Sequence, residues 1–189
     1  MLNRRDVVKR LLAERGDLLV VSGLGAPTYD VAWAGDHPLN FYLWGAMGGA
    51  AMIGLGLALA KPKARIAVIT GDGEMLMGLG SLATIGVKQP QNLSVVVVDN
   101  RHYGETGMQA SHTGAGIDLA AIARACKFAQ VRWLKAAEDV DVARALFHTG
   151  RGPIFMQAHV DWAQAPRVLP IRDGHDIKLR FTRALAKVG

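Results

Sequence analysis

The amino-acid sequence predicts a doubly wound α/β fold, in which helices cover both faces of a mainly parallel β-sheet. Short apolar segments of strand length alternate with helical segments along most of the 189 residues. One apolar segment, 93–100, contains four consecutive valines and no polar alternation, which is typical of a strand buried on both faces of a parallel sheet. Three of the predicted strands end in glycine or polar residues, at the edge where sheets of this class bind ligands.

The N-terminal half of the chain is predicted to form three helices and two strands before the valine-rich strand. Charged residues recur every three or four positions in 1–17, as in an amphipathic helix, and Asn3 is a suitable N-cap. The apolar run 18–25 ends in glycines, and the apolar run 64–73 continues into a Gly-Asp-Gly turn, so both are predicted strands. The other two helices are expected at 48–60 and 74–87.

The C-terminal half continues the same alternation. Asp118 stands near the start of a predicted helix, and the chain ends in an amphipathic pattern. Helices are expected at 118–128, 138–148 and 177–188, and strands at 130–135 and 153–160. We expect residues 1–189 to form a single domain, because the length suits one domain and no linker or repeat interrupts the chain.

The charge balance is basic, with 22 Lys and Arg against 16 Asp and Glu and a net charge of +6. The basic residues crowd the two ends of the chain, and no aromatic residues alternate with them as a nucleic-acid stacking platform requires. We therefore expect no nucleic-acid partner, and attribute the excess to a solvated face or to a partner subunit of opposite charge. The single cysteine, Cys126, excludes a disulfide framework and a Cys-x-x-Cys site, which is in keeping with a cytoplasmic protein.

Residues 41–60 form an uncharged stretch that is long enough to cross a membrane. Five of these twenty residues are glycine, however, and the aromatic residues stand only at one end. Glycine-rich helices also occur where backbones or ligands pack closely, so we expect no membrane association. An apolar stretch of this length must be covered, which favours association with another chain.

Gly71-Asp72-Gly73 is the first motif with chemical content. A predicted strand ends there, and a helix is expected from Glu74. Free N–H groups at a helix start bind anions, and the two glycines allow a ligand to approach the backbone closely. The Asp72 carboxylate can hold a cation that neutralises a phosphate, and Mg²⁺ suits such a site because it takes few protein oxygens. By itself the motif is equally consistent with an ordinary strand-to-helix turn.

Asp99-Asn100 closes the next predicted strand, 28 positions after Asp72. One strand–helix–strand unit covers about that distance, so both polar groups should reach the same edge of the sheet. The neutral amide oxygen of Asn100 would then lie beside the Asp72 carboxylate. Two such oxygens and a backbone carbonyl provide half of an octahedral Mg²⁺ site, and phosphate oxygens and water can complete it.

The order of Gly-Asp-Gly, helix, apolar strand, a pair ending in Asn, and then Tyr-Gly resembles the thiamine-diphosphate motif of the decarboxylase-like enzymes. The resemblance covers essentially the whole chain, as that family's cofactor-diphosphate domain. It implies thiamine diphosphate and Mg²⁺ as cofactors, with Asp72, Asn100 and the backbone carbonyl of His102 as metal ligands. Family members usually carry Asn-Asn where this chain has Asp99-Asn100, and the metal ligand is the second of the two. The cofactor-binding residues implied by the match are Ser22, Gly23, Gly71, Gly73, Glu74, Tyr103, Gly104 and Glu105.

Met47 stands 25 positions before Asp72. The family bends its cofactor over a bulky apolar residue at that place, which brings the amino group of the aminopyrimidine against the reactive thiazolium carbon. The resemblance therefore assigns this fulcrum to Met47, and it assigns acceptance of a hydrogen bond from the amino group to the carbonyl of Gly45. Without the spacing, Met47 would be interpreted as a core methionine.

A narrower resemblance involves three segments: DHPLNFYLWGAMG, YGETGMQASHT and KLRF. They are similar to sulfopyruvate and phosphonopyruvate decarboxylases, and in particular to the β-type subunit of the former. The resemblance implies a small 2-oxo acid with a second anionic group as substrate. An apolar or aromatic 2-oxo acid is the alternative, with Tyr42 and Trp44 near the pocket. His112 follows the motif and is a candidate for a substrate or proton-transfer role, whereas the other histidines lack metal-ligand spacing.

The family activates its cofactor with a glutamate carried by a separate pyrimidine-binding domain, for which 189 residues leave no room. Glu74 and Glu105 belong to the diphosphate side and cannot replace that glutamate. We therefore expect a hetero-oligomer in which a pyrimidine-binding α-type subunit supplies the glutamate, with the active site between the two chains.

Two other functions remain open from the sequence. The chain could be the matching half of another thiamine enzyme, such as a lyase or a transketolase-like ligase, or a non-catalytic nucleotide- or cofactor-binding module. A ferredoxin-coupled oxidoreductase subunit is disfavoured, because the chain has no clustered cysteines.

Overall fold

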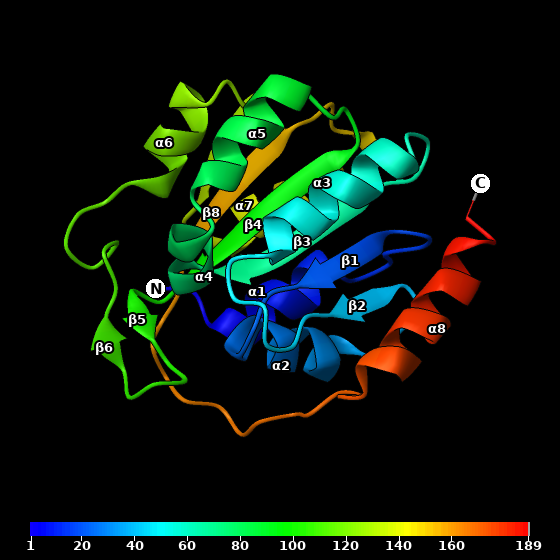
Figure 1. Cartoon of the computed structure of the whole chain (residues 1–189). Helices are drawn as coiled ribbons and strands as arrows, with labels where there is room; N and C mark the ends of the chain where they lie inside the picture. The colour runs from blue at the N-terminus through cyan, green and yellow to red at the C-terminus, as the bar shows by residue number, and fades with distance from the viewer. Residues whose placement is uncertain (189) are drawn as a thin grey trace.

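A computed structural model describes residues 1–188 and contains a six-stranded β-sheet between helical layers (Figure 1). The strands are β1 (Leu19–Ser22), β2 (Asn40–Tyr42), β3 (Ile66–Gly71), β4 (Leu93–Asp99), β7 (Gln130–Leu134) and β8 (Ile154–His159). They lie in the order β2-β1-β3-β4-β8-β7, and every pairing within this sheet is parallel. The predicted α/β fold with a mainly parallel sheet is confirmed.

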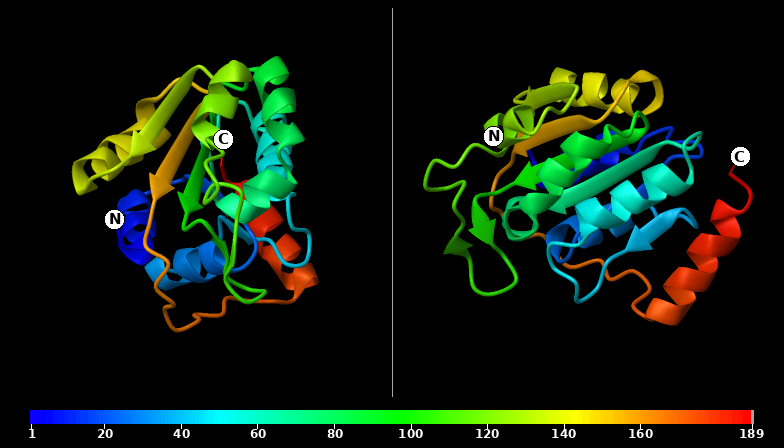
Figure 2. Two further views of the ribbon diagram at one scale, coloured as in Figure 1. Left: turned by 90° about the vertical axis from the view of Figure 1, so that its left-hand side faces the viewer. Right: turned by 45° about the horizontal axis from the view of Figure 1, so that its top comes forward.

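Helices cover both faces of the sheet. One face carries α3 (Ala50–Ala60), α5 (Gly80–Lys88) and α6 (Leu119–Ala125), and the other carries α1 (Arg4–Leu11), α2 (Ala26–Ala34) and α7 (Ala137–Thr149). The short helix α4 (Asp72–Met77) follows β3 directly, and α8 (Gly174–Leu185) lies beside β2 at the edge of the sheet, as Figure 2 shows. A separate antiparallel hairpin consists of β5 (His102–Tyr103) and β6 (Gln109–Ala110).

The central strand β4 explains why its sequence lacks polar alternation. Val95 and Val97 belong to the core on one face of the sheet, whereas Val96 and Val98 belong to the core on the other face. All four side chains are at most 2% exposed. Because successive side chains of a strand point to opposite faces, a strand with helices on both sides needs an apolar residue at every position.

The predicted helix over 74–87 is wrong in its extent, because two helices replace it. The helix α4 begins at Asp72, the second residue of the Gly-Asp-Gly motif. It ends at Met77, and Gly78 and Leu79 separate it from α5. A Cβ atom at Gly78 would lie only 2.2 Å from the carbonyl oxygen of Gly48. The loop before α3 therefore packs directly against the end of α4. Helical periodicity in the sequence does not reveal this contact.

Three elements were not predicted from the sequence: α2, β2 and the hairpin of β5 and β6. The helix α2 starts after Gly25, which has a φ of +76°, and has a proline in its first turn, so its start follows a known helix signal. The uncharged stretch 41–60 divides into the end of β2, a glycine-rich loop and α3. Among residues 1–188, no helix combines the length and the apolar character that crossing a membrane requires.

The N-terminal segment contains the N-cap that the sequence predicts, and it pairs with the residue that follows β8. The side chain of Asn3 caps α1 by accepting a hydrogen bond of 3.1 Å from the backbone of Asp6. Leu2 forms a parallel bridge with Val160, and the backbone N–H of Val160 donates to the carbonyl of Asp99. The start of α1 therefore lies next to the end of β4.

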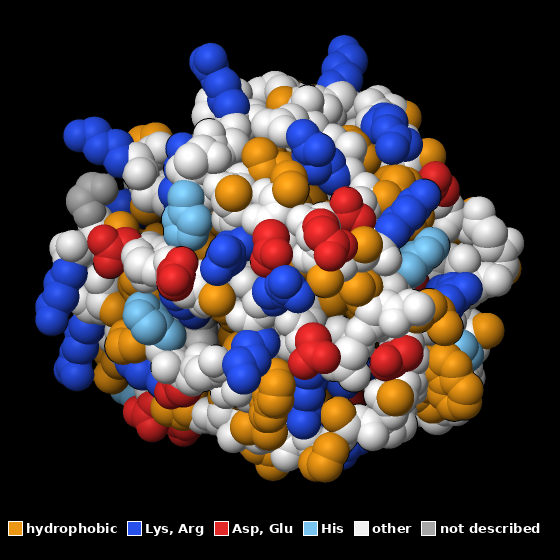
Figure 3. Space-filling view, turned by 180° about the vertical axis from the view of Figure 1, so that it is seen from behind, with side chains coloured by type: hydrophobic (Ala, Val, Ile, Leu, Met, Phe, Trp, Pro, Cys, Tyr) orange, Lys and Arg blue, Asp and Glu red, His pale blue; other side chains and the backbone are white. Residues whose placement is uncertain are grey.

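The basic excess is not gathered into one patch on the face seen in Figure 3. Lys and Arg side chains are spread over that face, with acidic side chains between them. Among the ion pairs of the chain, Arg10 pairs with Asp141 at 2.8 Å, and Arg180 pairs with Asp36 at 2.6 Å. This surface has the character of a solvated face with mixed charges.

Two glycines of α3 allow a matched test of its packing. A Cβ atom at the buried Gly54 would lie 2.3 Å from a methyl carbon of Val68 on β3, whereas Gly56 faces open space. We expect Gly54→Ala to lower the free energy of unfolding by about 1–3 kcal/mol through overpacking. We expect Gly56→Ala to raise it by about 0.5–1 kcal/mol, because alanine favours the helix. Chemical denaturation of both variants measures these changes, and equal effects would contradict the packing described here.

Candidate active site

The carboxyl ends of β3 and β4, the loop after β1 and the loop before α3 border a pocket of about 400 Å³. This is the edge at which the sequence predicts a ligand site. Eleven predicted site residues line the pocket together: Met47, Gly71, Asp72, Gly73, Glu74, Asn100, His102, Tyr103, Gly104, Glu105 and His112.

Three predicted residues lie outside the pocket lining: Ser22, Gly23 and Gly45. Ser22 is fully buried, and its hydroxyl lies 2.6 Å from that of Thr28. A Cβ atom at Gly23 would lie 1.9 Å from a carboxylate oxygen of Glu74, so this glycine is needed for contact with a protein side chain. Gly45 is exposed, two residues before Met47, with a φ of +78° that favours glycine.

Asp72 is buried at the start of α4, with only 2% of its surface exposed. The hydroxyl of Ser111 donates a hydrogen bond to Oδ2, and the hydroxyl oxygen of Thr113 lies 3.2 Å from the same atom. Burial raises the pKa of Asp72 from 3.8 to about 6, and the nearby Asp99 carboxylate also raises it, while the Ser111 hydroxyl opposes the shift. The site therefore holds a carboxylate that is incompletely compensated when it is ionised.

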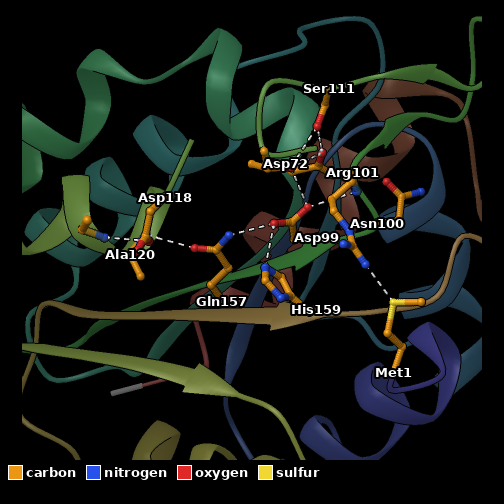
Figure 4. Close-up of polar contacts among 12 residues, drawn as sticks. Met1, Asp72, Asp99, Asn100, Arg101, Ser111, Asp118, Ala120, Gln157 and His159 are labelled. Carbon is orange, nitrogen blue, oxygen red and sulfur yellow. Dashed lines mark hydrogen bonds and ion pairs between the residues drawn. The ribbon is translucent and has the colours of Figure 1, made fainter. Parts of the chain in front are cut away.

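Asp99 lies behind Asp72 and is fully buried (Figure 4). Its Oδ1 accepts from the hydroxyl of Thr113 at 2.8 Å, and its Oδ2 accepts from the amide of Gln157 at 2.7 Å. The ring of His159 lies 3.5 Å from Oδ2. Thr113 thus links the two carboxylates, and Gln157 and His159 bring β8 into the network.

The residues that support the two carboxylates were not predicted from the sequence. Residues 111–113 alternate in exposure: Ser111 and Thr113 are buried, whereas His112 between them is exposed and lines the pocket. Residues 112–116 form turns rather than a strand, and Gly114 and Gly116 donate backbone hydrogen bonds to the carbonyls of Ser111 and Thr113. Nothing in the sequence indicates Gln157 or His159 as partners, because β8 becomes a neighbour of β4 only in the folded sheet.

Asn100 is held by a tight turn directly after β4. Its side-chain oxygen accepts a hydrogen bond of 3.0 Å from the backbone of His102, and the carbonyl of Asn100 lies 2.9 Å from Nδ1 of the same histidine. Arg101 between them has a φ of +63°, an uncommon conformation for a residue with a side chain. The turn orients Asn100 and His102 toward the pocket that Asp72 also lines.

Glu74 connects three segments around the pocket: the loop after β1, the end of β3 and the start of α3. Its Oε2 accepts from the backbone N–H of Leu24 at 2.7 Å and from the hydroxyl of Thr70 at 3.0 Å, and its Oε1 lies 3.4 Å from the backbone nitrogen of Ala50. Burial raises the pKa of Glu74, while these donors act in the opposite direction. The carboxylate therefore faces the protein backbone after β1 and at the start of α3.

Met47 lies on the pocket wall with 36% of its surface exposed, so the alternative interpretation as a core methionine is wrong. Tyr103 and Gly73 also line the pocket and pack against each other, because a Cβ atom at Gly73 would lie 2.5 Å from the tyrosine ring. The two aromatic residues considered for an apolar substrate lie elsewhere. Tyr42 is buried and donates to Asp36 at 2.8 Å, and Trp44 donates to the carbonyl of Ile171 at 3.1 Å.

The oxygen atoms of the pocket suit a hard divalent cation. Asp72 offers a carboxylate, Asn100 an amide oxygen and His102 a backbone carbonyl, which are the ligand types that Mg²⁺ takes. Residues 1–188 contain no group of three or more His, Cys, Asp or Glu side chains arranged to hold a metal. Of the three predicted ligands, only Asp72 would bind through a carboxylate. A cation here would therefore also need oxygens from another molecule.

Comparison with known proteins identifies the family. Residues 26–158 match the family model described as "Thiamine pyrophosphate enzyme, C-terminal TPP binding domain". The chain belongs to this family. The matched residues run from the start of α2 through β3 and β4 to most of β8, and therefore include nearly all of the pocket lining.

Two sulfopyruvate decarboxylase β subunits are similar to this thiamine pyrophosphate-binding chain. The subunit from Methanothermobacter thermautotrophicus is 38% identical over 97% of this chain and 95% of the relative, and the subunit from Methanocaldococcus jannaschii is 44% identical over 65% of each. Phosphonopyruvate decarboxylase from Streptomyces viridochromogenes is 38% identical over 88% of this chain, which spans only 43% of that longer protein.

A solved structure supports the fold. A Mycobacterium smegmatis protein, described as a thiamin diphosphate-dependent enzyme, superposes with a TM-score of 0.69 over 86% of this chain and 32% of that chain. The two sequences are only 18% identical, so this likeness concerns the fold alone.

The raised pKa of Asp72 leads to a prediction about stability. Because the folded-state pKa is about 6 and the ordinary value is 3.8, the folded state holds a proton that the unfolded state has lost between these pH values. Stability should therefore fall as pH rises from about 4 to 6, by roughly 2–3 kcal/mol in total. In metal-free buffer at pH 7.5, Asp72→Asn should exceed the wild-type chain in free energy of unfolding, and the difference should vanish near pH 4.

Urea unfolding across this pH range measures the effect. Asp17→Asn is a suitable control, because Asp17 is an exposed carboxylate in the loop before β1. Its difference from the wild-type chain should change less with pH than the difference for Asp72→Asn. A pH-independent difference for Asp72→Asn would contradict the assigned shift.

Proposed function

We propose that this chain is the thiamine diphosphate- and Mg²⁺-binding subunit of a heteromeric 2-oxo acid decarboxylase that acts on sulfopyruvate- or phosphonopyruvate-like acids. The observation that carries the proposal is one pocket, at the carboxyl edge of the sheet, that gathers Asp72, Asn100 and Met47. The chain also matches a sulfopyruvate decarboxylase β subunit over 97% of its length. The cytoplasm is the compartment that we propose, because the single cysteine indicates no disulfides.

Asp72, Asn100 and the carbonyl of His102 are the proposed metal ligands. Their oxygens suit Mg²⁺, whose remaining positions would take oxygens of the cofactor diphosphate and water. The incompletely compensated charge of Asp72 favours a bound cation, because a cation offsets the electrostatic penalty of a buried carboxylate. The backbone of Gly71 and Gly73, together with Tyr103, Gly104 and Glu105, would lie along the diphosphate.

Met47 is proposed as the apolar support that holds the bent form of the cofactor, with the carbonyl of Gly45 as the acceptor for its amino group. The exposed side chain of Met47 in the pocket wall supports this role. When bound, thiamine diphosphate supplies the electron sink for loss of CO₂ from a 2-oxo acid. Met47 and Gly45 would contribute orientation, which lowers the entropic part of the barrier.

Ser22, Gly23 and Glu74 receive an indirect role in this proposal. Ser22 contacts Thr28, and Gly23 lies against Glu74, which lines the pocket and accepts from the backbone of Leu24. The three residues would therefore shape the wall of the diphosphate site. His112 is the proposed residue for substrate contact or proton transfer, because it is exposed and lines the pocket.

A pyrimidine-binding α-type subunit is the proposed partner, and it would supply the glutamate that activates the cofactor. The described residues of the pocket support this need, because Glu74 is bonded to backbone groups and Glu105 pairs with Arg167 at 3.2 Å. The naming of several relatives as β subunits also supports a hetero-oligomer.

Other thiamine enzymes are the alternative. The β subunit of a 2-oxoacid:ferredoxin oxidoreductase from Aeropyrum pernix is 32% identical over 56% of this chain. That match is shorter than the matches to the decarboxylase subunits, and this chain has only one cysteine. We therefore retain decarboxylation as the proposed reaction.

The metal assignment is tested by cofactor binding. We expect Asn100→Ala and Asp72→Ala to weaken Mg²⁺-dependent binding of thiamine diphosphate at least about tenfold, because each removes a ligand oxygen. Calorimetric titration with and without Mg²⁺ measures the affinity. Gln109→Ala, which removes an exposed amide of the neighbouring hairpin, is the control and should bind normally. Unchanged affinity in both ligand variants would refute the metal site.

The reaction is tested with the assembled enzyme. The native partner is copurified with the chain, and decarboxylation of sulfopyruvate, phosphonopyruvate, pyruvate and benzoylformate is compared by kcat/KM. We expect the chain alone to be inactive and the complex to prefer the two acids with a second anionic group. A preference for pyruvate or benzoylformate would reject the substrate class and leave the thiamine assignment standing. Full activity of the isolated chain would reject the partner.

A further inference from the structure

A buried cluster of charge next to the pocket remains outside the proposed catalytic set. Asp30 on α2 is fully buried, and both Arg4 and Arg5 at the start of α1 pair with it. The side chains of the two arginines are only 11% and 13% exposed. One carboxylate therefore faces two guanidinium groups, and the cluster carries an excess of positive charge in a region of low exposure.

The two arginines of this cluster differ in what else they contact. Arg5 donates to the backbone carbonyl of Pro166 and lies over the ring of Trp33, at 5.4 Å from its centroid. Arg4 uses Nε and Nη2 to hold Asp30, and within residues 1–188 no hydrogen bond involves its Nη1. Arg4 lines the pocket, whereas Arg5 does not. Asp30 thus fixes the Arg4 guanidinium with donors still available toward the pocket.

Arg4 is also the one Lys or Arg among the described residues that line the pocket. The acidic and histidine residues of the lining are Asp72, Glu74, Glu105, His102 and His112. A diphosphate carries more negative charge than one divalent cation neutralises, so its site needs a further cation. Guanidinium groups meet this need well, because their planar arrangement of donors matches the oxygens of a phosphate.

The fold sets Arg4 at the metal end of the pocket. Leu2 pairs with Val160, and Val160 bonds to the carbonyl of Asp99, so the residues just before Arg4 lie beside the end of β4 that Asn100 follows. On the other side, Asp30 follows Pro27 by one helical turn, and Pro27 lines the pocket next to Gly71. These neighbours belong to the Asp72 and Asn100 region rather than to the loop of Met47.

We propose that Arg4, held in place by Asp30, binds the terminal phosphate of thiamine diphosphate. This inference rests on the proposed function and adds a diphosphate ligand from α1, outside the residues 26–158 that match the family model. A sulfonate or phosphonate group of the substrate has similar chemistry and is the other possible source of an oxyanion. The location of Arg4 near the end of β4 favours the cofactor phosphate, because the substrate would react at the ring that Met47 supports.

The experiment compares Arg4→Gln with Arg5→Gln in the full-length chain. Each variant leaves Asp30 with one arginine, but only the first removes a cation from the pocket. Calorimetric titration with Mg²⁺ gives the affinities for thiamine diphosphate and for thiamine monophosphate. Arg4→Gln should weaken diphosphate binding about tenfold or more, whereas Arg5→Gln should change it less than about threefold. The preference for the diphosphate over the monophosphate should shrink in Arg4→Gln alone.

The other outcomes separate the competing explanations. Equal losses in both arginine variants, or equal losses for both ligands, would show that Arg4 acts only through folding and would overturn the inference. An unchanged cofactor affinity with a raised KM for sulfopyruvate in the assembled enzyme would assign Arg4 to the substrate instead. If Arg4→Gln does not fold, Arg4→Lys replaces it, and wild-type affinity and preference in Arg4→Lys would then overturn the proposal. A wild-type chain that binds no thiamine diphosphate would refute the proposed function itself.

Discussion

The structure depends on hydrogen bonds and ion pairs that compensate the charge of carboxylates buried near one edge of a parallel sheet. Asp30, Asp72, Glu74 and Asp99 are each at most 4% exposed. A buried carboxylate is unfavourable unless hydrogen bonds or cations compensate it. The partners differ. Asp30 pairs with two arginines, and Asp72 accepts from the Ser111 hydroxyl. Glu74 accepts from backbone N–H groups and a hydroxyl, and Asp99 accepts from a hydroxyl, a side-chain amide and a backbone N–H. These partners come from segments far apart in the sequence, so compensation draws the loops of the pocket together.

The kind of partner decides what each carboxylate can do. Glu74 accepts hydrogen bonds from the backbone N–H groups of Leu24 and Ala50, so it fixes the loop after β1 and the start of α3. Asp72 and Asp99 accept hydrogen bonds from hydroxyl and amide groups, and among residues 1–188 no Lys or Arg pairs with either, so Asp72 leaves negative charge at the pocket. Asp30 has the opposite character, because its two arginines leave positive charge. The edge therefore presents a cation-attracting region beside an anion-attracting one, which is the pattern that a metal-bound diphosphate requires.

Much of the fold follows from periodicity that is local in the sequence. The valines of β4, the apolar runs that became β3 and β8, and the capping residues Asn3 and Asp118 all predict their elements correctly. The failures occur where a contact between distant segments overrides the local pattern. The helix predicted over 74–87 breaks because Gly78 packs against Gly48, and the hairpin of β5 and β6 forms only two residue pairs that local propensity cannot predict.

The sequence by itself determined the class of fold, the family resemblance and the residues that gather around the pocket, because strand ends and motif spacing are properties of short segments. It did not determine which of those residues face the pocket and which face the protein. Ser22 and Gly23 are turned to Thr28 and Glu74, and the supporting residues Ser111, Thr113 and Gln157 went unrecognised. Only the tertiary structure decided this, because the hydrogen-bond partner of a buried polar group is chosen by whichever distant segment the packed sheet brings within reach.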